Sequence, residues 1–393
     1  MKLNHGIHLA YCTNVHRGGD WAETFNSLNK DVMRVRARVS PDHPYAIGLR
    51  LGADAARELA DANRLLEFQR WLEINNSYVF TINGFPYGQF HGTRVKEQVY
   101  RPDWSKPDRL EYTNLLFDLL SELLPAGVDG SVSTLPGSFK EFIGPEGVPD
   151  AIYDNLESCC RHVENLTKRT GQDLHLGLEP EPLGLFETSG ETVAFLDALG
   201  QRIGSDDSWK RIIGVNYDTC HLAVEFEEPT VAFGRILDSG YRISKIHLSS
   251  ALTVIPTREA LERLADFHEE VYLHQVVAAR NGEVIHRKKD LDLALQDAAG
   301  QSFGGLGEEW RIHFHVPLHA SPGPPFGDTR DHVLGTLDIL QQNPALCTHL
   351  EMETYTWEVL PRELRTDDVV DQVVKEYGWT RRELENRGLA DTI

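Results

Sequence analysis

Short apolar runs alternate with long amphipathic stretches along the whole chain, and this alternation constrains the fold more than any other feature of the sequence. The apolar runs are typical of buried strands, and the amphipathic stretches between them are typical of covering helices. Eight runs predict strands at residues 6–12, 78–83, 130–133, 174–178, 212–217, 243–248, 312–316 and 349–352. Helical patterns fill the intervals, for example at residues 111–124, 151–170, 191–199 and 331–342.

Eight strands with helical returns favour a closed (β/α)8 barrel, or TIM barrel, of the α/β class. A doubly wound sheet would usually show fewer strands and a Gly-rich first turn. Barrels grow by insertion, so the 393 residues are compatible with one barrel domain over residues 1–393. We therefore expect a single (β/α)8 barrel.

Two stretches exceed the simple repeat, at about residues 38–76 and 271–301. The second contains Asn281-Gly282 between alternating runs, which predicts a β-hairpin insertion between strands six and seven. Residues 363–393 are expected to form a C-terminal helical tail.

Charge and composition exclude several classes of partner. The formal net charge is −21 and no Lys/Arg cluster is evident, so a nucleic-acid partner is disfavoured. The five cysteines show no CxxC spacing, which fits a reducing compartment. The sequence has no apolar leader and no run near about 18 apolar residues, so we expect a cytoplasmic protein without direct membrane insertion. A homo-oligomer or a pathway protein partner is left open.

Carboxylates and imidazoles follow several of the apolar runs, at the strand ends that face the mouth of a barrel. These are Glu179 and Glu181 after strand four, Asp218 and His221 after strand five, His247 in strand six, His315 in strand seven, and Glu351 and Glu353 in strand eight. Several buried carboxylates repel one another unless a cation lies between them, so the pattern predicts a divalent metal ion. Mn²⁺, Mg²⁺, Co²⁺, Fe²⁺ and Zn²⁺ all suit such ligands. Any single residue of this kind is more often a cap or an ion-pair partner.

Two further groups of polar residues complete the candidate site. His8, Tyr11, Asn14, Asn83 and Tyr87 form a neutral hydrogen-bonding set suited to a polyol or a heterocycle, although capping and aromatic packing would explain them equally well. His313 and His349 lie deeper along their strands, and we expect them either to pack in the core or to support the metal ligands from behind.

The motifs Glu179-Pro180-Glu181-Pro182 and Asp218-x-x-His221, with His247 and a strand-eight Glu, resemble the xylose-isomerase-like TIM-barrel superfamily of sugar isomerases and epimerases. Segments 8–16, 83–88 and 350–357 are similar to one branch, the metabolite traffic protein EboE family. The second resemblance implies an association with secondary-metabolite traffic.

The superfamily resemblance implies roles for individual residues. It places the metal ligands at Glu179, Asp218, His247 and Glu353, the acid and base at Glu179 and Glu353, and a contact to substrate hydroxyls at His221. We also expect substrate contacts from Glu181, His315 and Glu351, and Glu351 could exchange roles with Glu353 because both point to the same side of the strand.

The chain departs from the superfamily pattern at two points. Glu181 stands where xylose isomerases have a lysine, and the arginine of the epimerases is not evident after His247. We therefore expect a metal-dependent isomerase or epimerase acting on a small polyhydroxylated metabolite. The alternatives are a non-catalytic metabolite carrier or scaffold, and a metal-dependent hydrolase, which His313-x-His315 would support.

Overall fold

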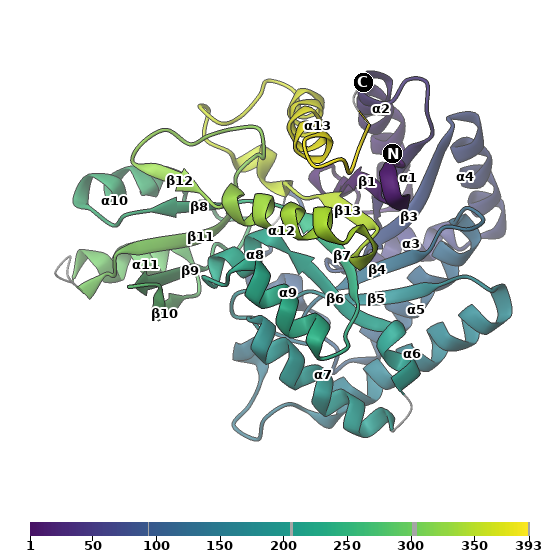
Figure 1. The fold of residues 1–393 in the computed structure, drawn as a ribbon, viewed down its shortest axis with the longest axis horizontal. Coiled ribbons are helices and arrows are strands. Elements are labelled where there is room, and N and C mark those ends of the chain that lie inside the picture. The colour runs from purple at the N-terminus through teal and green to yellow at the C-terminus, as the bar shows by residue number, and fades with distance from the viewer. Residues whose placement is uncertain (93, 205–206, 301–304, 392–393) are drawn as a thin grey trace.

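The computed structural model describes residues 1–92, 94–204, 207–300 and 305–391. Within these ranges, eight parallel strands with helices between them form a TIM barrel (Figure 1). The barrel strands are β1 (His8–Tyr11), β2 (Tyr45–Arg50), β3 (Ser77–Asn83), β4 (Gly130–Thr134), β5 (Leu174–Leu178), β6 (Ile213–Asp218), β7 (Ile243–Leu248) and β13 (His349–Met352).

The barrel strands are hydrogen-bonded to their neighbours in the order β1-β13-β7-β6-β5-β4-β3-β2. A parallel bridge between Cys12, next to β1, and Gly48 of β2 joins the first and last strands of this order. Most residues of these strands are buried on both faces, which explains why they appear in the sequence as nearly continuous apolar runs. The carboxyl ends of all eight strands therefore meet at one mouth.

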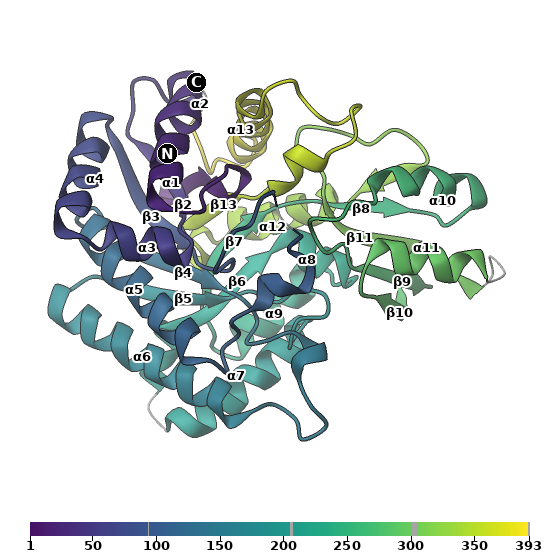
Figure 2. The same ribbon diagram turned by 180° about the vertical axis from the view of Figure 1, so that it is seen from behind.

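A smaller antiparallel sheet lies beside the barrel, with α10 and α11 next to it (Figures 1 and 2). Its strand order is β10-β9-β11-β8-β12. The strands are β8 (Ala251–Val254), β9 (Val276–Arg280), β10 (Glu283–Lys288), β11 (Glu309–His315) and β12 (Phe326–Asp328). The whole sheet is inserted between β7 and β13.

The helices follow amphipathic stretches with recognisable ends. In α6, Ile152, Leu156, Val163 and Leu166 are buried along one face, and Gly171 ends the helix with a φ of +74°. The helices are α1 (Trp21–Ser27), α2 (Met33–Val39), α3 (Ala53–Leu59), α4 (Ala62–Ile74), α5 (Pro107–Leu123), α6 (Asp150–Thr170), α7 (Ser189–Ile203), α8 (Thr219–Val224), α9 (Pro229–Asp238), α10 (Arg258–Leu264), α11 (Leu291–Ala299), α12 (Arg330–Gln342) and α13 (Val369–Glu385). None of the helices in the described ranges is both long and apolar enough to cross a lipid bilayer.

The structure corrects the position of the strand that we expected seventh in the barrel. Residues 312–316 lie largely in β11, which pairs antiparallel with β8 and β9 in the small sheet, and β2 occupies the missing place in the barrel. The physical reason is visible in the sequence: β11 buries Trp310, Ile312 and Phe314 in the core of the small sheet and turns alternate residues the other way. β2 falls within residues 38–76, which we expected to be an addition to the repeat.

The insertion is longer than expected at residues 271–301, because β8, β11 and β12 belong to the same sheet as β9 and β10. β9 and β10 pair antiparallel around Asn281-Gly282, and both turn residues have positive φ. In the C-terminal tail, α13 packs against α2. Residue 301 of the expected insertion and residues 392–393 of the tail lie outside the described residues.

Candidate metal centre

Four side chains from neighbouring barrel strands meet at the mouth, and we call Glu179, Asp218, His247 and Glu353 the carboxylate centre. Glu179 follows β5, Asp218 ends β6, His247 lies near the end of β7, and Glu353 follows β13. One potential ligand atom from each lies within 4.8 Å of the others, and all four residues are buried. The structure thus brings together the four residues that the superfamily resemblance indicated.

The imidazole of His247 lies at the middle of the carboxylate centre. Its Nδ1 atom is 3.2 Å from Glu179 Oε1, 3.5 Å from Asp218 Oδ2 and 3.1 Å from Glu353 Oε2. A single N–H can donate well to only one of three such acceptors. Among the described residues, Asp218 Oδ2 has no hydrogen-bond partner although it is buried. The arrangement therefore leaves carboxylate oxygens unsatisfied by protein donors alone.

Neighbouring amides hold each carboxylate in its orientation. The side-chain amide of Asn216 donates to Glu179 Oε2 at 2.8 Å, and that of Asn14 donates to Glu353 Oε1 at 2.7 Å. Asp218 Oδ1 accepts from the backbone N–H groups of Cys220 and His221, which makes Asp218 the N-cap of α8. In each case one oxygen is held by a donor while the other faces His247.

A buried ion pair lies behind His247. Glu351 Oε2 is 3.0 Å from His247 Nε2 and accepts from Lys245 Nζ at 2.7 Å, and all three side chains are fully buried. Because Nε2–H donates to Glu351, the Nδ1 lone pair of a neutral His247 points into the carboxylate centre. The structure therefore corrects the expected substrate contact at Glu351, because this carboxylate lies on the far side of His247 from the carboxylate centre. Glu353 is the strand-eight member of the centre.

The charges around the centre shift several pKa values. Burial alone would lower the pKa of His247, but the carboxylates of Glu353 and Glu179 outweigh it and hold this pKa well above its ordinary value. Burial alone would raise the pKa of Asp218, but His221 and His247 hold it well below its usual range. The pKa of Glu351 is lowered to about 2, because Lys245 and His247 outweigh the effect of burial.

A cavity of about 50 Å³ opens next to the carboxylate centre and has room for only a few water molecules in this conformation. Its polar wall includes Asn14, Asn83, Glu179, Glu181, His221, His313 and Glu353. Its apolar wall includes Phe85, Phe90, Tyr272 and Tyr355. Asn14, Asn83 and Glu181 thus lie where a substrate contact was expected. Burial, together with repulsion from Glu179, raises the pKa of Glu181 to about 7.

Val271 and Tyr272, in the insertion that forms the small sheet, help to cover this cavity. The backbone carbonyl of Val271 accepts from the N–H groups of Val95 and Lys96, and Tyr272 Oη is 2.6 Å from His91 Nδ1. Lys96 is buried and pairs with Asp290 at 2.7 Å. The loop after β3 and the insertion therefore close over the barrel mouth together.

Three residues of the expected substrate set lie elsewhere. His8 begins β1 at the opposite end of the barrel, where its Nδ1 is 2.7 Å from Tyr78 Oη. Tyr11 points out of the barrel towards Tyr377 of α13, because alternate residues of a strand face opposite sides. The hydroxyl of Tyr87 accepts from Arg57 on the surface. The structure therefore corrects the expected substrate contacts at His8, Tyr11 and Tyr87, because these side chains lie away from the cavity.

His221, His313 and His315 meet beside the carboxylate centre, and we call them the histidine cluster. His313 Nε2 is 3.1 Å from His221 Nε2 and 3.2 Å from His315 Nε2. His313 and His221 line the cavity, whereas His315 does not. Of the two positions expected for His313, the structure has the one beside the site and not the one in the core, because β11 turns this residue away from the core of the small sheet and towards the barrel mouth.

Sequence reasoning also missed Lys245, Asn216 and the apolar cover at Tyr272 and Tyr355. Lys245 and Asn216 carried a signal: each is a polar residue inside an apolar strand, two positions before a member of the carboxylate centre and thus on the same face. The cover carried none, since its contacts join segments distant in the sequence.

Solved structures share this fold at low sequence identity. D-allulose 3-epimerase from Methylomonas sp. in complex with D-allulose is 13% identical, with a TM-score of 0.52 over 98% of this chain and 99% of that one. The IOLI protein with a bound zinc atom is 10% identical, with a TM-score of 0.50 over 96% and 98% of the two chains. No protein-family model and no curated protein matches the chain. The fold is that of the xylose-isomerase-like TIM barrels, and the EboE resemblance stays a prediction.

Proposed function

We propose that this protein is a metal-dependent isomerase or epimerase that moves a proton next to the carbonyl group of a small polyhydroxylated metabolite. The observation that carries the proposal is the convergence of three buried carboxylates on His247 Nδ1, at 3.1 to 3.5 Å, beside a cavity.

The residues of the carboxylate centre fit a divalent cation. Three carboxylates in a buried site repel one another, and Asp218 Oδ2 lacks a donor among the described residues. Glu351 fixes His247 in the tautomer that offers a ring nitrogen to an ion. We infer that Glu179, Asp218, His247 and Glu353 hold the ion, whose identity this mixed oxygen and nitrogen set does not select.

When bound, such an ion polarises a carbonyl and makes the neighbouring C–H bond more acidic. Glu179 and Glu353 both line the cavity and enter it from β5 and β13, with β6 and β7 between them in the barrel. In the proposal one carboxylate removes the proton from the substrate carbon and the other returns it. Asn216 holds Glu179 in position, and Asn14 and Asn83 hold Glu353.

The cavity supports a small substrate with both polar and apolar faces. Asn14 Oδ1 is buried without a hydrogen-bond partner in the described part of the chain and lies on the cavity wall, so it can accept from a hydroxyl group. The rings of Phe90, Tyr272 and Tyr355 offer an apolar surface for C–H groups. We propose a sugar substrate by analogy with the epimerase structure that holds D-allulose, and a divalent metal by analogy with the IOLI structure that holds zinc.

Hydrogen exchange with solvent tests the proposal directly. Protein stripped of metal and reloaded with Mn²⁺, Co²⁺ or Zn²⁺ is incubated in D2O with a panel of ketoses and aldoses, and deuterium at the carbon next to the carbonyl is followed by NMR. We expect metal-dependent exchange in at least one sugar, and its loss in both Glu179→Gln and Glu353→Gln.

Glu376→Gln is the matched control. Glu376 is another buried glutamate, bonded to Thr354 and Gln372, and burial raises its pKa to about 8, so an amide replaces a neutral acid there. Exchange should persist in this variant. Metal-independent exchange, or exchange that survives both glutamate substitutions in the carboxylate centre, would contradict the proposal. Metal-dependent sugar binding without exchange would favour the carrier alternative.

A further inference from the structure

We propose a second divalent-metal site at the histidine cluster, formed by the Nε2 atoms of His221, His313 and His315 and selective for a zinc-like ion. The site adjoins the carboxylate centre, and its three imidazole ligands are not members of that centre. It is independent of the proposed isomerase activity, because its ligands are identified by their own geometry.

The tautomer of each ring is fixed by a carbonyl oxygen. Carbonyl oxygens only accept hydrogen bonds, so each Nδ1 must carry the proton that it donates. The acceptors are the backbone oxygen of Pro180 for His221 at 3.0 Å, the side-chain oxygen of Gln275 for His313 at 2.8 Å, and the backbone oxygen of Glu353 for His315 at 2.8 Å. The amide nitrogen of Gln275 donates to Pro182 O at 3.0 Å, which fixes the orientation of that side chain.

Three neutral rings fixed in this way each present a lone pair at Nε2. The Nε2 atom of His313 is 3.1 Å from that of His221 and 3.2 Å from that of His315. Zn–N bonds of about 2.0–2.1 Å at tetrahedral angles separate neighbouring ligand atoms by about 3.3 Å. These two separations match those of imidazoles that share one ion, with His313 between His221 and His315.

Hydrogen bonding alone does not satisfy the cluster. A proton on His221 Nε2 would serve the contact with His313, but the contact between His313 Nε2 and His315 Nε2 would still set two lone pairs against each other. A cation at the centre of the three rings removes this repulsion.

An unpartnered carboxylate oxygen lies at the border of the two sites. The potential ligand atoms of Asp218, His221 and His315 all lie within 4.8 Å of one another. Asp218 is fully buried, and its Oδ2 atom has no hydrogen-bond partner within the ranges that the structure describes. Asp218 can therefore supply an oxygen ligand between two ions.

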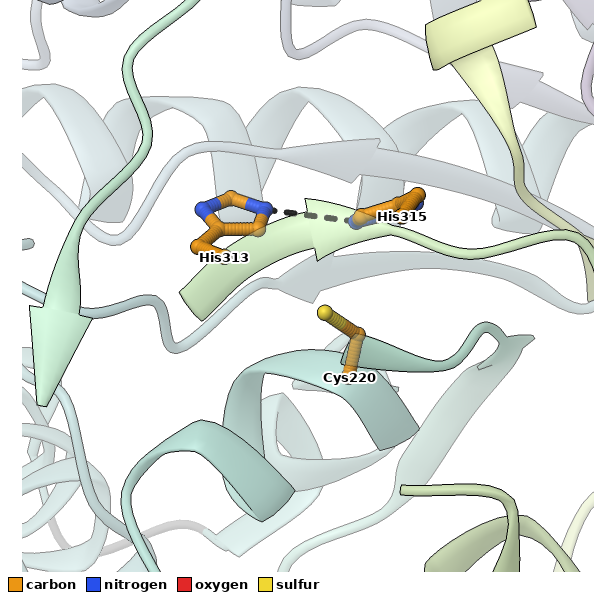
Figure 3. A group of neighbouring side chains, drawn as sticks. All are labelled: Cys220, His313 and His315. Carbon is orange, nitrogen blue, oxygen red and sulfur yellow. Dashed lines mark hydrogen bonds between the residues drawn. The ribbon is translucent and has the colours of Figure 1, made fainter. Parts of the chain in front are cut away.

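Cys220 also faces the cluster. Figure 3 shows its Sγ atom, from α8, pointing towards the strand that carries His313 and His315. Each of the three Nε2 atoms already presents a lone pair, whereas a thiol must first lose its proton to bind a metal ion, so we assign the site to the three histidines.

Metal counting tests the inference in the full-length protein. Chelator-stripped protein is titrated with Zn²⁺ by calorimetry, and the zinc retained after gel filtration is counted by mass spectrometry. We expect two tight equivalents in the wild type, one in Glu353→Gln and one in His313→Gln. The titration of wild type with Mn²⁺ should show one tight equivalent, because carboxylates suit Mn²⁺ and imidazoles suit Zn²⁺.

His175→Gln is the matched control, since His175, His349 and Asp129 form another group of potential ligands near the opposite end of the barrel. This variant should retain two equivalents. Loss of zinc in His175→Gln with retention in His313→Gln would overturn the inference. If the wild type binds one zinc equivalent and only Glu353→Gln loses it, the inference is overturned and the proposed function is left intact. If the wild type binds one zinc equivalent and only His313→Gln loses it, the inference is supported and the proposed metal centre is contradicted.

X-ray absorption of the zinc-loaded Glu353→Gln protein gives a second measurement that does not depend on folding of a histidine variant. We expect the signature of three imidazole ligands. The Co²⁺-loaded form of the same protein should show no thiolate-to-metal charge-transfer band. Such a band, or fewer than two imidazoles, would overturn the three-histidine assignment.

Discussion

The carboxylate centre and the histidine cluster lie side by side, yet they are built on different principles. The carboxylate centre takes all its members from the ends of barrel strands and carries three carboxylates, with a buried Lys245–Glu351 pair behind it. The histidine cluster takes two members from β11 of the small sheet and one from α8, and carbonyl oxygens orient its rings. The first depends on balanced charge, and the second depends on fixed tautomers.

This difference shows how two kinds of ligand set can lie beside one cavity. Closure of a parallel barrel forces strand ends together, so a centre built there needs no contribution from another sheet. The histidine cluster exists only because an insertion brings a second sheet against the barrel mouth. Four substitutions test whether charge balance and tautomer control are the features that separate the two.

The largest effect is expected from Lys245→Met, which leaves Glu351 ionised and buried without its cation. Breaking a buried pair by removing one partner costs about 3–5 kcal/mol of stability. Urea unfolding of the metal-free protein measures it. The double variant Lys245→Met/Glu351→Gln should recover most of the loss, because the uncompensated charge is gone. A double variant no more stable than the single one would show that charge balance does not distinguish the carboxylate centre.

Glu353→Gln should have the next largest effect. The amide oxygen can keep the bonds from Asn14 and Asn83, but one anionic ligand is lost. Substituting residues that merely support a ligand weakens metal binding by about 10–100-fold, so we expect a loss of more than about 100-fold in Mn²⁺ affinity. Without metal, the variant should melt at or above the wild-type temperature, because one like charge is removed. Equal Mn²⁺-induced shifts in melting temperature for both proteins would remove Glu353 from the centre.

Gln275→Met examines the histidine cluster in the corresponding way. Methionine cannot accept the Nδ1–H of His313, so the ring is no longer held in one tautomer. We expect about a 10-fold loss of Zn²⁺ affinity in the Glu353→Gln background, at the lower end of the range for such supporting residues. Mn²⁺ binding in the otherwise wild-type chain should stay unchanged. A fall in Mn²⁺ affinity of the same size would show that the two sites are not separate.

Gly282→Ala should have the smallest effect and serves as a control on the insertion. Gly282 has a φ of +79° at the hairpin turn, and an added Cβ meets no atom within 4 Å, so only backbone strain is added. An L-residue in this conformation costs about 1 kcal/mol, measurable by urea unfolding. Zinc binding should match the wild type in calorimetry, since among the described residues no hydrogen bond or ring contact joins Asn281-Gly282 to the histidine cluster. A change in zinc affinity would show that the cluster responds to strain anywhere in the small sheet.

The sequence by itself determined most of the barrel and the strand ends at which the carboxylate centre forms, and the resemblance to the superfamily singled out its four members. Seven of the strands were predictable because residues buried on both faces leave continuous apolar runs, and polar residues at the ends of those runs could point only to the mouth. Even Lys245 and Asn216 were visible, as polar residues in phase with His247 and Asp218. Strand periodicity, a local property, fixed which face each of these side chains occupies.

Only the tertiary structure decided the rest. The alternating pattern of β11 fits a strand in either sheet, and its place depends on pairing with β8 and β9, far away along the chain. Glu351 and Glu353 differ in their depth in the barrel. The alternation of side chains along the strand cannot distinguish the two, because it places both on the inner face. The histidine cluster and the cover over the cavity join β11, α8 and the loop after β3, and such long-range packing has no period in the sequence.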